Sequence, residues 1–539
     1  MLNTDRAWEG RIDRLIALLL FLCVLCCAAS RLNFDCERGD DFAAYLNEAF
    51  AIADGTLDEQ ARRNYRMHPS ELPEEAGGGE LVYVWGYPLV QAQIYRLVGF
   101  DRENYRSILF YKLPLVLSLA LSAVLLYSFY RRWLSRATAL LLSTWICLTI
   151  LRDIDSLYSD LFFFFLFCTC LELTERFLEI LEEPEDGKRW LPCGFALGVT
   201  LLAVYETRLN GWSVCAFAAA LQLARLLQRK RAARSIWPAL LPWVVFGVGL
   251  LVCNYVVFRP ATSNISDVSD FNRQRVFAYS VLYEYLLESF LTSVPGLSFT
   301  NINNVYTNTI ARSVIRLEAL LPVCLTLAGC AITTRRSKAT LPYLLFFLGN
   351  YLVLVLLPYV QGIRYCYLML PVLMLYFGTG LEASAKALAH CIKGKARPLL
   401  SGVCLALSFA VLLNASLYEG KTDLFRVLRG EDVRGEGWDA AYSSQTLDMW
   451  RYIREQTPED CVISFFKPRA LYLNTLRESF RPDVNGNESR HADYYLSYDF
   501  PGSERASEIL EERLDRLTPV FTSGEAVLYR YTDSGQASG

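Results

Sequence analysis

Residues 13–45 read DRLIALLLFLCVLCCAASRLNFDCERGDDFAAY, and this stretch decides the architecture. It begins with an apolar run, 13–31, of the about 20 residues that are needed to cross roughly 30 Å of bilayer hydrocarbon. A polar loop follows, and it contains an acidic pair, Asp40 and Asp41. Carboxylates held at the mouth of a membrane helix bundle are energetically costly and usually mark a functional site. The stretch therefore predicts a membrane anchor followed by chemistry at the membrane surface.

The composition extends this interpretation to the whole chain. Of the 539 residues, 53% are hydrophobic and 13% are aromatic, which is more than a soluble core of this length requires. Apolar runs recur along the sequence and predict about eleven membrane spans. They are 13–31, 107–130, 137–151, 158–175, 190–206, 211–228, 236–257, 314–333, 340–359, 364–384 and 398–417.

Basic residues flank these runs on alternate sides. With a cytoplasmic N-terminus, the inner loops hold Arg131, Arg132, Arg136, Arg225, Arg229, Lys230, Arg231, Arg234, Arg335, Arg336, Lys338, Lys386, Lys393, Lys395 and Arg397, and the short outer links hold Arg152, Arg208 and Arg364. This positive-inside bias predicts a multi-pass protein of the cell membrane, with the N-terminus cytoplasmic and the C-terminal domain extracytoplasmic. The first run also resembles a signal peptide, but no small-residue cleavage site follows it, so we expect it to remain as an anchor.

Charge and cysteine usage exclude some functions. The net charge of −3 gives no support to nucleic-acid binding, and no Cys or His spacing resembles a zinc site. Most cysteines lie inside apolar runs and are typical of small buried hydrophobic residues. Cys36 and Cys461 fall in outer soluble segments, and whether they pair is left open because sequence does not establish proximity.

The fold class that follows is mostly α, with a polytopic membrane helix bundle and a small C-terminal α/β domain. We expect residues 1–417 to form the membrane module, with outer loops 32–106 and 258–312, and residues 418–539 to form the extracytoplasmic domain. Amphipathic helices are predicted at 41–53, 87–98 and 277–290, and the last two suit the membrane interface. In the tail, helices predicted at 446–455 and 506–517 alternate with strands predicted at 462–466, 494–498, 519–522 and 526–531.

Asp41 is the first candidate for chemistry. On a helix, Asp41, Tyr45 and Glu48 share one face. A purely structural alternative is that Asp40 and Asp41 cap this helix, because its unpaired N–H groups and dipole favour carboxylates at the N-terminus. The two roles are compatible, since the same dipole keeps a general base ionised.

Asp160 is the second candidate. It precedes Leu161 and four consecutive phenylalanines, on the same predicted side of the membrane as Asp41. A charge at the head of such an apolar helix needs a wet cavity or a partner. An ordinary helix cap in the membrane interface is the alternative.

Cations recur at the same predicted depth. Arg208 and Arg364 occupy tight outer turns, while Lys112 lies several residues inside its span and Arg316 just inside another. Guanidinium groups that converge at the outer surface suit a phosphate, because Arg offers planar, bidentate hydrogen bonding. Each cation alone is equally consistent with an anchor to lipid headgroups. Four at one level favour an anionic ligand.

These residues belong to a set of segments that resembles a known family. The segments are Gly39-Asp40-Asp41 with Tyr45 and Gly55, Trp85-Gly86-Tyr87-Pro88-Leu89 with Tyr95 and Gly99, Tyr158-Ser159-Asp160, Thr207-Arg208, Arg364-Tyr365 with Pro371, and, in the tail, Trp450 to Glu455 with Thr457-Pro458, Val462-Ile463, Lys467-Pro468-Arg469 and Tyr472. In their order they resemble the GT-C-fold glycosyltransferases, the group that includes protein O-mannosyltransferases and lipid A aminoarabinose transferases. Those enzymes use a sugar attached to a polyprenyl phosphate. The resemblance spans nearly the whole chain.

The resemblance implies an inverting glycosyl transfer that needs no cofactor beyond the lipid-linked donor. The catalytic residues that it implies are Asp41, as general base, Asp40 and Asp160, and the substrate-binding residues are Arg208, Arg364, Lys112, Tyr45 and Tyr365. The second acidic residue of the family pattern, one position after Asp41, is replaced by Phe42, so Asp41 is the stronger candidate of the pair. The Trp-Trp-Asp-Tyr-Gly signature of oligosaccharyltransferase catalytic subunits is absent, which argues against N-glycosylation of protein.

Two other classes stay open. One is a polytopic lipid or oligosaccharide transporter or flippase, and the other is a catalytically inactive scaffold in envelope assembly. Transporters tend to show inverted repeats and mid-membrane charges, whereas here no repeat is visible and the charges cluster at one predicted surface. The implied partners are membrane lipid, a polyprenyl-phosphate sugar donor and a glycan, lipid or protein acceptor. The sequence does not define the donor sugar, the acceptor or a metal requirement.

Overall fold

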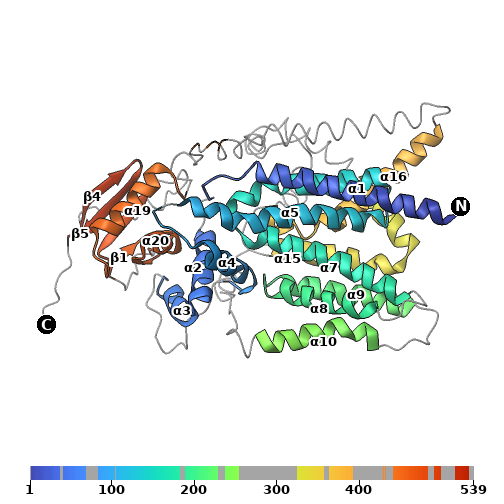
Figure 1. Cartoon of the computed structure of the whole chain (residues 1–539), viewed down its shortest axis with the longest axis horizontal. Coiled ribbons are helices and arrows are strands. Elements are labelled where there is room, and N and C mark those ends of the chain that lie inside the picture. Colours follow the sequence, from blue (N-terminus) through green and yellow to red (C-terminus); the bar gives the residue numbers. More distant parts are fainter. Residues whose placement is uncertain are drawn as a thin grey trace.

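The structure, a computed structural model, describes residues 2–36, 40–67, 83–103, 105–182, 189–228, 237–253, 324–356, 363–391, 426, 429, 431, 441–482, 491–498 and 516–532. Within these ranges the molecule is elongated, with a helix bundle at one end and a small α/β domain at the other (Figure 1). Outer loop 258–312, the apolar run 398–417, most of the predicted helix 506–517 and the proposed boundary at residue 417 all lie outside the described residues.

The bundle consists of long helices that run along the long axis of the molecule (Figure 1). They are α1 (Leu2–Ala29), α5 (Ile108–Arg131), α6 (Arg136–Thr149), α7 (Ser159–Glu182), α8 (Trp190–Tyr205), α9 (Gly211–Gln228), α10 (Trp237–Val252), α15 (Leu341–Leu356) and α16 (Leu370–Cys391). The short 3₁₀ turns η1 (Tyr105–Ser107), η2 (Leu151–Ser156), η5 (Lys338–Thr340) and η6 (Ile363–Cys366) lie at helix ends. Each long helix corresponds to an apolar run of the sequence, so these runs are helical.

Length and hydropathy support membrane crossing for part of this bundle. In the described part of the chain, Arg11–Ala29 and Tyr105–Arg131 are long and apolar enough to cross a membrane. Arg136–Thr149, Trp190–Tyr205, Trp237–Val252 and Leu341–Leu352 are shorter apolar helices. The mostly helical fold is confirmed, whereas the count of about eleven spans is not.

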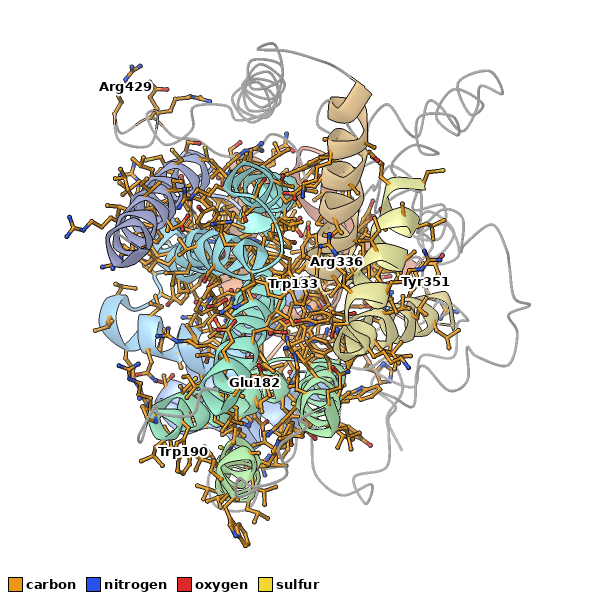
Figure 2. The ribbon with its side chains drawn as sticks, turned by 90° about the vertical axis from the view of Figure 1, so that its right-hand side faces the viewer. Trp133, Glu182, Trp190, Arg336, Tyr351 and Arg429 are labelled. Atoms are coloured by element: carbon orange, nitrogen blue, oxygen red, sulfur yellow. The ribbon has the colours of Figure 1, made fainter. Side chains whose placement is uncertain are left out.

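Small residues let some helices approach each other closely. A Cβ on Gly198 of α8 would lie 2.6 Å from the carbonyl oxygen of Pro242 and 2.6 Å from Cβ of Val245, both on α10. Close backbone approach of this kind is a common source of packing energy between membrane helices. Figure 2 views the bundle end-on and shows a densely packed interior, with Trp133 near the middle of this end and Trp190 at its edge.

Three short helices lie between the bundle and the C-terminal domain (Figure 1). They are α2 (Asp40–Asp54), α3 (Leu57–Arg66) and α4 (Gly86–Val98). The sequence predicted α2 and α4 almost to the residue and did not predict α3. Residues 42–51 of α2 are all buried, because α2 packs on α4 and on α20 (Pro468–Thr475) of the C-terminal domain. Helix α2 is therefore the joint between the two parts of the molecule.

The C-terminal domain is a mixed sheet with two helices, α19 (Ser444–Gln456) and α20. Its strands are β1 (Val462–Ser464), β2 (Glu478–Phe480), β3 (Tyr494–Tyr498), β4 (Leu517–Ser523) and β5 (Ala526–Tyr531), in the order β2-β1-β3-β5-β4. Strand β1 pairs in parallel with β2 and β3, and β5 pairs antiparallel with β3 and β4. Met449 and Ile453 of α19 belong to the same apolar core as Ile463 and Leu528 of the sheet. The small α/β domain is confirmed, although the sequence missed α20 and β2.

Candidate active site

The candidate site lies at the end of the bundle that faces α2 and the C-terminal domain. Four segments meet there: the start of α2, the start of α7 after η2, the turn between α8 and α9, and η6 before α16. Each is a helix start or a tight turn, where side chains reach beyond the packed helix faces. The segments bring Asp41 beside Arg364 and Asp160 beside Arg208, and Arg208 and Arg364 line one crevice.

Asp160 and Arg208 form a buried ion pair. Oδ1 of Asp160 lies 2.6 Å from Nη1 of Arg208, and the two side chains are 6% and 17% exposed. The same nitrogen donates to Oγ of Ser159 at 3.3 Å. Removing one partner of such a pair leaves a buried charge, at a cost of about 3–5 kcal/mol. The pair therefore fixes the start of α7 to the α8–α9 turn.

Tyr45, on α2, contacts the Asp160–Arg208 pair through Ser159. Its hydroxyl oxygen lies 2.7 Å from Oγ of Ser159, in a hydrogen bond in which either group can donate. Its ring stacks on Tyr83 at 4.1 Å and meets Tyr87 edge-on at 5.1 Å. Burial raises the pKa of Tyr45 above its ordinary value, so the phenol stays protonated. The resemblance suggested a substrate ligand, whereas the buried Tyr45 side chain positions Ser159.

Asp41 lies beside Arg364. Its Oδ2 is 3.4 Å from Nη2 of Arg364, and the two side chains are 36% and 26% exposed. The guanidinium also covers the ring of Tyr158, 4.5 Å from its centroid. Burial raises the pKa of Tyr83 well above its ordinary value, and Asp41 adds to that increase, so a protonated phenol lies near this carboxylate. A partly exposed ion pair contributes only about 0–1 kcal/mol, and Asp41 is therefore loosely held.

The crevice is small and contains both arginines. Its walls are Asp160, Phe163, Phe164, Arg208, Asn210, Arg364, Tyr367 and Leu368, and its cavity volume is about 10 Å³. That volume holds about one water molecule. A phosphate therefore fits between the two arginines only when the side chains that line the crevice move apart. Two guanidinium groups on a partly apolar wall suit a phosphate.

Asp40 has different surroundings although it adjoins Asp41. Its Oδ2 is 3.2 Å from Nη1 of Arg469, and its Oδ1 accepts from the backbone N–H of Ala470 at 3.0 Å. Both partners belong to the first turn of α20. Burial raises the pKa of Asp40, and Arg469 and the Ala470 N–H oppose that increase. Asp40 fastens the C-terminal domain to α2, and we assign it this structural role in place of the catalytic role that the sequence suggested.

Lys112 is fully buried in α5, and its ammonium group is already occupied. Nζ donates to Oδ1 of Asn33 at 2.7 Å, to the backbone carbonyl of Asp35 and to Oδ1 of Asp155 at 3.1 Å. An ammonium has three N–H donors, so these partners use them all. Lys112 ties the chain after α1 to η2, and in this structure its ammonium group is turned to these partners, while Arg208 and Arg364 line the crevice. The side chain of Tyr365, in η6, lies outside the described residues, as does Arg316.

Helix α4 braces the turn that carries Arg208. The backbone N–H of Gly86 donates to the carbonyl oxygen of Glu206 at 2.7 Å, and a Cβ on Gly86 would lie 2.4 Å from that oxygen. Only glycine allows this approach. The Glu206 carboxyl, in the turn beyond the end of α8, is buried, and burial raises its pKa to about 7 while the Trp85 indole opposes the increase. This turn is thus held through its backbone, and its Arg208 and Asn210 side chains line the crevice.

Three residues near the site were not singled out from the sequence: Ser159, Asn210 and Tyr367. Ser159 links α2 to Arg208, Asn210 lines the crevice, and the Tyr367 hydroxyl donates to Oδ2 of Asp153. Ser159 and Asn210 stand within two residues of charged candidates in the sequence, and that proximity is a usable signal. Tyr367 carries no such signal.

The two candidate carboxylates of the site are arranged as ion pairs with arginines. In the portions of the chain that the structure describes, no group of three or more His, Cys, Asp or Glu side chains is arranged to hold a metal ion. Asp41 and Asp160 instead have arginine partners.

Comparison with known proteins gives relatives in fold only. No family model matches the chain, and no curated protein matches its sequence. An apo oligosaccharyltransferase from Archaeoglobus fulgidus aligns with a TM-score of 0.56 and 12% identity, over 93% of this chain and 69% of that one. AglB, an oligosaccharyltransferase of the same organism solved with an inhibitory peptide and a dolichol-phosphate, gives 0.55 and 11%, over 89% and 69%. ArnT from Cupriavidus metallidurans, bound to undecaprenyl phosphate, gives 0.53 and 12%, over 98% of both chains.

These neighbours are GT-C-fold glycosyltransferases, and the chain has a GT-C-like fold. The fold that the motif order suggested is thereby confirmed. The likeness to ArnT includes the C-terminal domain, because nearly the whole of both chains is covered.

Proposed function

We propose that this protein is an integral-membrane glycosyltransferase that moves a sugar from a polyprenyl-phosphate donor to a hydroxyl acceptor, with inversion, at the extracytoplasmic face. One observation carries the proposal: Asp41, Asp160, Arg208 and Arg364 come from distant segments and meet at one end of a GT-C-like bundle. Neighbours in fold that were solved with dolichol-phosphate and undecaprenyl phosphate support a lipid-linked phosphate as the ligand.

The exterior of the bundle suits contact with lipid. Large apolar side chains are exposed on α1, α5, α8 and α10, for example Leu15, Leu117, Phe195 and Val248, each about half exposed. Large apolar side chains exposed on several helices suit contact with a membrane or with another protein. The positive-inside bias of the sequence supports a cytoplasmic N-terminus and an extracytoplasmic site.

The donor phosphate would bind in the crevice at Arg208 and Arg364, with its lipid tail between helices. Phosphate oxygens compete with the carboxylates for the same N–H donors. The Asp41–Arg364 pair, at 3.4 Å and partly exposed, yields more readily than the buried Asp160–Arg208 pair at 2.6 Å. Donor binding would therefore engage Arg364 and release Asp41, while Asp160 keeps Arg208 in place.

Asp41 would then serve as the general base. Its carboxylate accepts the proton of the acceptor hydroxyl as that oxygen forms a bond to the anomeric carbon of the sugar. The bond from the anomeric carbon to the phosphate oxygen breaks, and polyprenyl phosphate leaves with the electron pair. Attack opposite the leaving group inverts the anomeric centre. The leaving group needs no acid, because Arg208 and Arg364 stabilise its charge.

Mass spectrometry of envelope lipids and glycans tests the proposal. Cells that lack the protein should lose one sugar from a lipid, glycan or protein, and the wild-type gene should restore it. Asp41→Asn should fail to restore it, because loss of a general base lowers the rate by about 10² to 10⁴. The matched control is Asp40→Asn, whose carboxylate binds α20.

Two outcomes contradict the proposal. An unchanged profile in cells without the protein removes the transferase activity. Restoration by Asp41→Asn, at wild-type level in the membrane, removes the catalytic role of Asp41 and favours a scaffold.

A further inference from the structure

The α8–α9 turn holds two buried acceptors that have no hydrogen-bond partner within the described structure. They are Oε1 of Glu206 and Oδ1 of Asn210. An unpaired buried acceptor destabilises the folded state. Glu206 can offset this by taking up a proton, since burial raises its pKa to about 7. An amide does not titrate, so Asn210 keeps its unpaired oxygen.

The two residues also differ in what they face. Asn210 lines the crevice, together with Arg208 and Arg364, whereas Glu206 does not. Each arginine in that wall already has a carboxylate partner. The crevice thus combines cations suited to a phosphate with a neutral acceptor that lacks a donor.

We propose, on the basis of the function proposed above, that Asn210 recognises the donor sugar by accepting a hydrogen bond from a ring hydroxyl next to the phosphate. The connectivity of the donor supports this. The phosphate is attached to the anomeric carbon, and the neighbouring ring carbon carries the nearest hydroxyl. A phosphate held at Arg208 and Arg364 brings that hydroxyl to the same wall.

This contact makes Asn210 a specificity-determining residue. A site built to pair a substrate hydroxyl discriminates strongly against a ligand that lacks it, because the buried acceptor is then left unpaired. The bare polyprenyl phosphate that remains after transfer lacks the hydroxyl. Asn210 thus favours the sugar-bearing donor over the spent carrier and assists its release.

The experiment compares lipid binding to the full-length protein by native mass spectrometry. The probes are undecaprenyl phosphate alone and undecaprenyl phosphate that carries single hexoses or pentoses. Wild type should bind at least one sugar-bearing lipid roughly tenfold more tightly than the bare lipid. Asn210→Val should lose this preference without losing affinity for the bare lipid. Asn210→Asp, which keeps an acceptor oxygen at the position of Oδ1, should retain the preference, while its added charge weakens the binding of both lipids alike.

The melting temperature provides a second measurement, and a substitution at another amide side chain serves as its control. Asn210→Val should leave the melting temperature unchanged or higher, because it removes an unpaired acceptor. Gln222→Leu, at an amide of α9 whose Oε1 accepts from Trp243 Nε1 at 2.7 Å, should lower the melting temperature and leave the lipid preference intact.

The outcomes separate the inference from the proposed function. Equal wild-type affinity for the bare and all sugar-bearing lipids overturns the inference, and so does a preference that survives in Asn210→Val. If wild type binds neither kind of lipid, the proposed function itself fails.

Discussion

The two ends of the helix bundle both carry arginine–carboxylate pairs, but their geometry differs. At the distal end, away from the C-terminal domain, Arg132 contacts Glu172 and, at 2.8 Å, Glu179. Nearby, Glu175 accepts from Arg225 at 3.1 Å and from the Tyr343 hydroxyl. Arg132 thus pairs with two carboxylates, and Glu175 accepts from one guanidinium and one hydroxyl. Through these contacts the distal network joins α5, α7, α9 and α15.

At the site end, the pairs border empty space. Asp160 and Arg208 are 2.6 Å apart, Asp41 and Arg364 are 3.4 Å apart, and both arginines line the crevice. An ion pair whose members have a second partner and adjoin no crevice stabilises the fold. In a weak ion pair beside a crevice, the arginine can exchange its carboxylate partner for a substrate anion. The 3.4 Å spacing of the Asp41–Arg364 pair and the adjoining crevice distinguish the site end, since the residue types at the two ends are the same.

Among the substitutions at the two ends, Arg208→Ala should lower the rate of sugar transfer most. Loss of one preorganised group that stabilises developing charge lowers turnover by about 10² to 10³. The measurement is the amount of transferred sugar per molecule of folded protein in the membrane. Near-normal transfer would remove Arg208 from phosphate binding.

Arg132→Ala is the matched change at the distal end. It leaves Glu172 without this partner in a largely buried position, so we expect a loss of about 3–5 kcal/mol in the free energy of unfolding. Transfer per folded molecule should stay close to wild type. The melting temperature measures the loss of stability, and the amount of sugar product measures transfer. A loss of transfer per folded molecule as large as that of Arg208→Ala would show that the two ends do not differ in function.

Asp40→Asn should have a moderate effect confined to the joint. Hydrogen bonds to a charged group contribute about 1.5–3 kcal/mol, and this change weakens those from Arg469 and Ala470. Hydrogen exchange should increase in α20 while transfer changes only a few-fold. A loss of transfer equal to that of Asp41→Asn, without faster hydrogen exchange in α20, would show that Asp40 has a catalytic role.

Glu206→Gln should have the smallest effect, and that effect depends on pH. The folded pKa of about 7 lies above the ordinary value of 4.5. Between these values the folded state binds more protons than the unfolded state, so ionisation of Glu206 lowers stability as the pH rises through this window. The melting temperature of the variant should gain on wild type from pH 5 to pH 8. A difference that does not change with pH would show that Glu206 titrates normally.

The sequence predicted the helices well because apolar length and flanking charge are local properties. It also singled out Asp41, Asp160, Arg208 and Arg364 as candidates, since a charge beside an apolar run is visible without a structure. It did not predict their pairing, which depends on how α7 packs against the α8–α9 turn.

Asp40 shows why adjacent residues can differ in their contacts. One step along a helix turns the side chain by about 100°, so Asp40 and Asp41 face different neighbours. The neighbour of Asp40 is α20, a short helix that the sequence did not reveal. The contacts of Lys112 were not predictable for a similar reason, because its partners Asn33 and Asp155 come from distant segments.

The most direct measurement is a structure of the wild-type protein with undecaprenyl phosphate bound. The phosphate should lie within hydrogen-bonding distance of both Arg208 and Arg364, and Asp41 should no longer pair with Arg364. A phosphate bound elsewhere, with both ion pairs intact, would contradict the claim that this end of the bundle is the donor site.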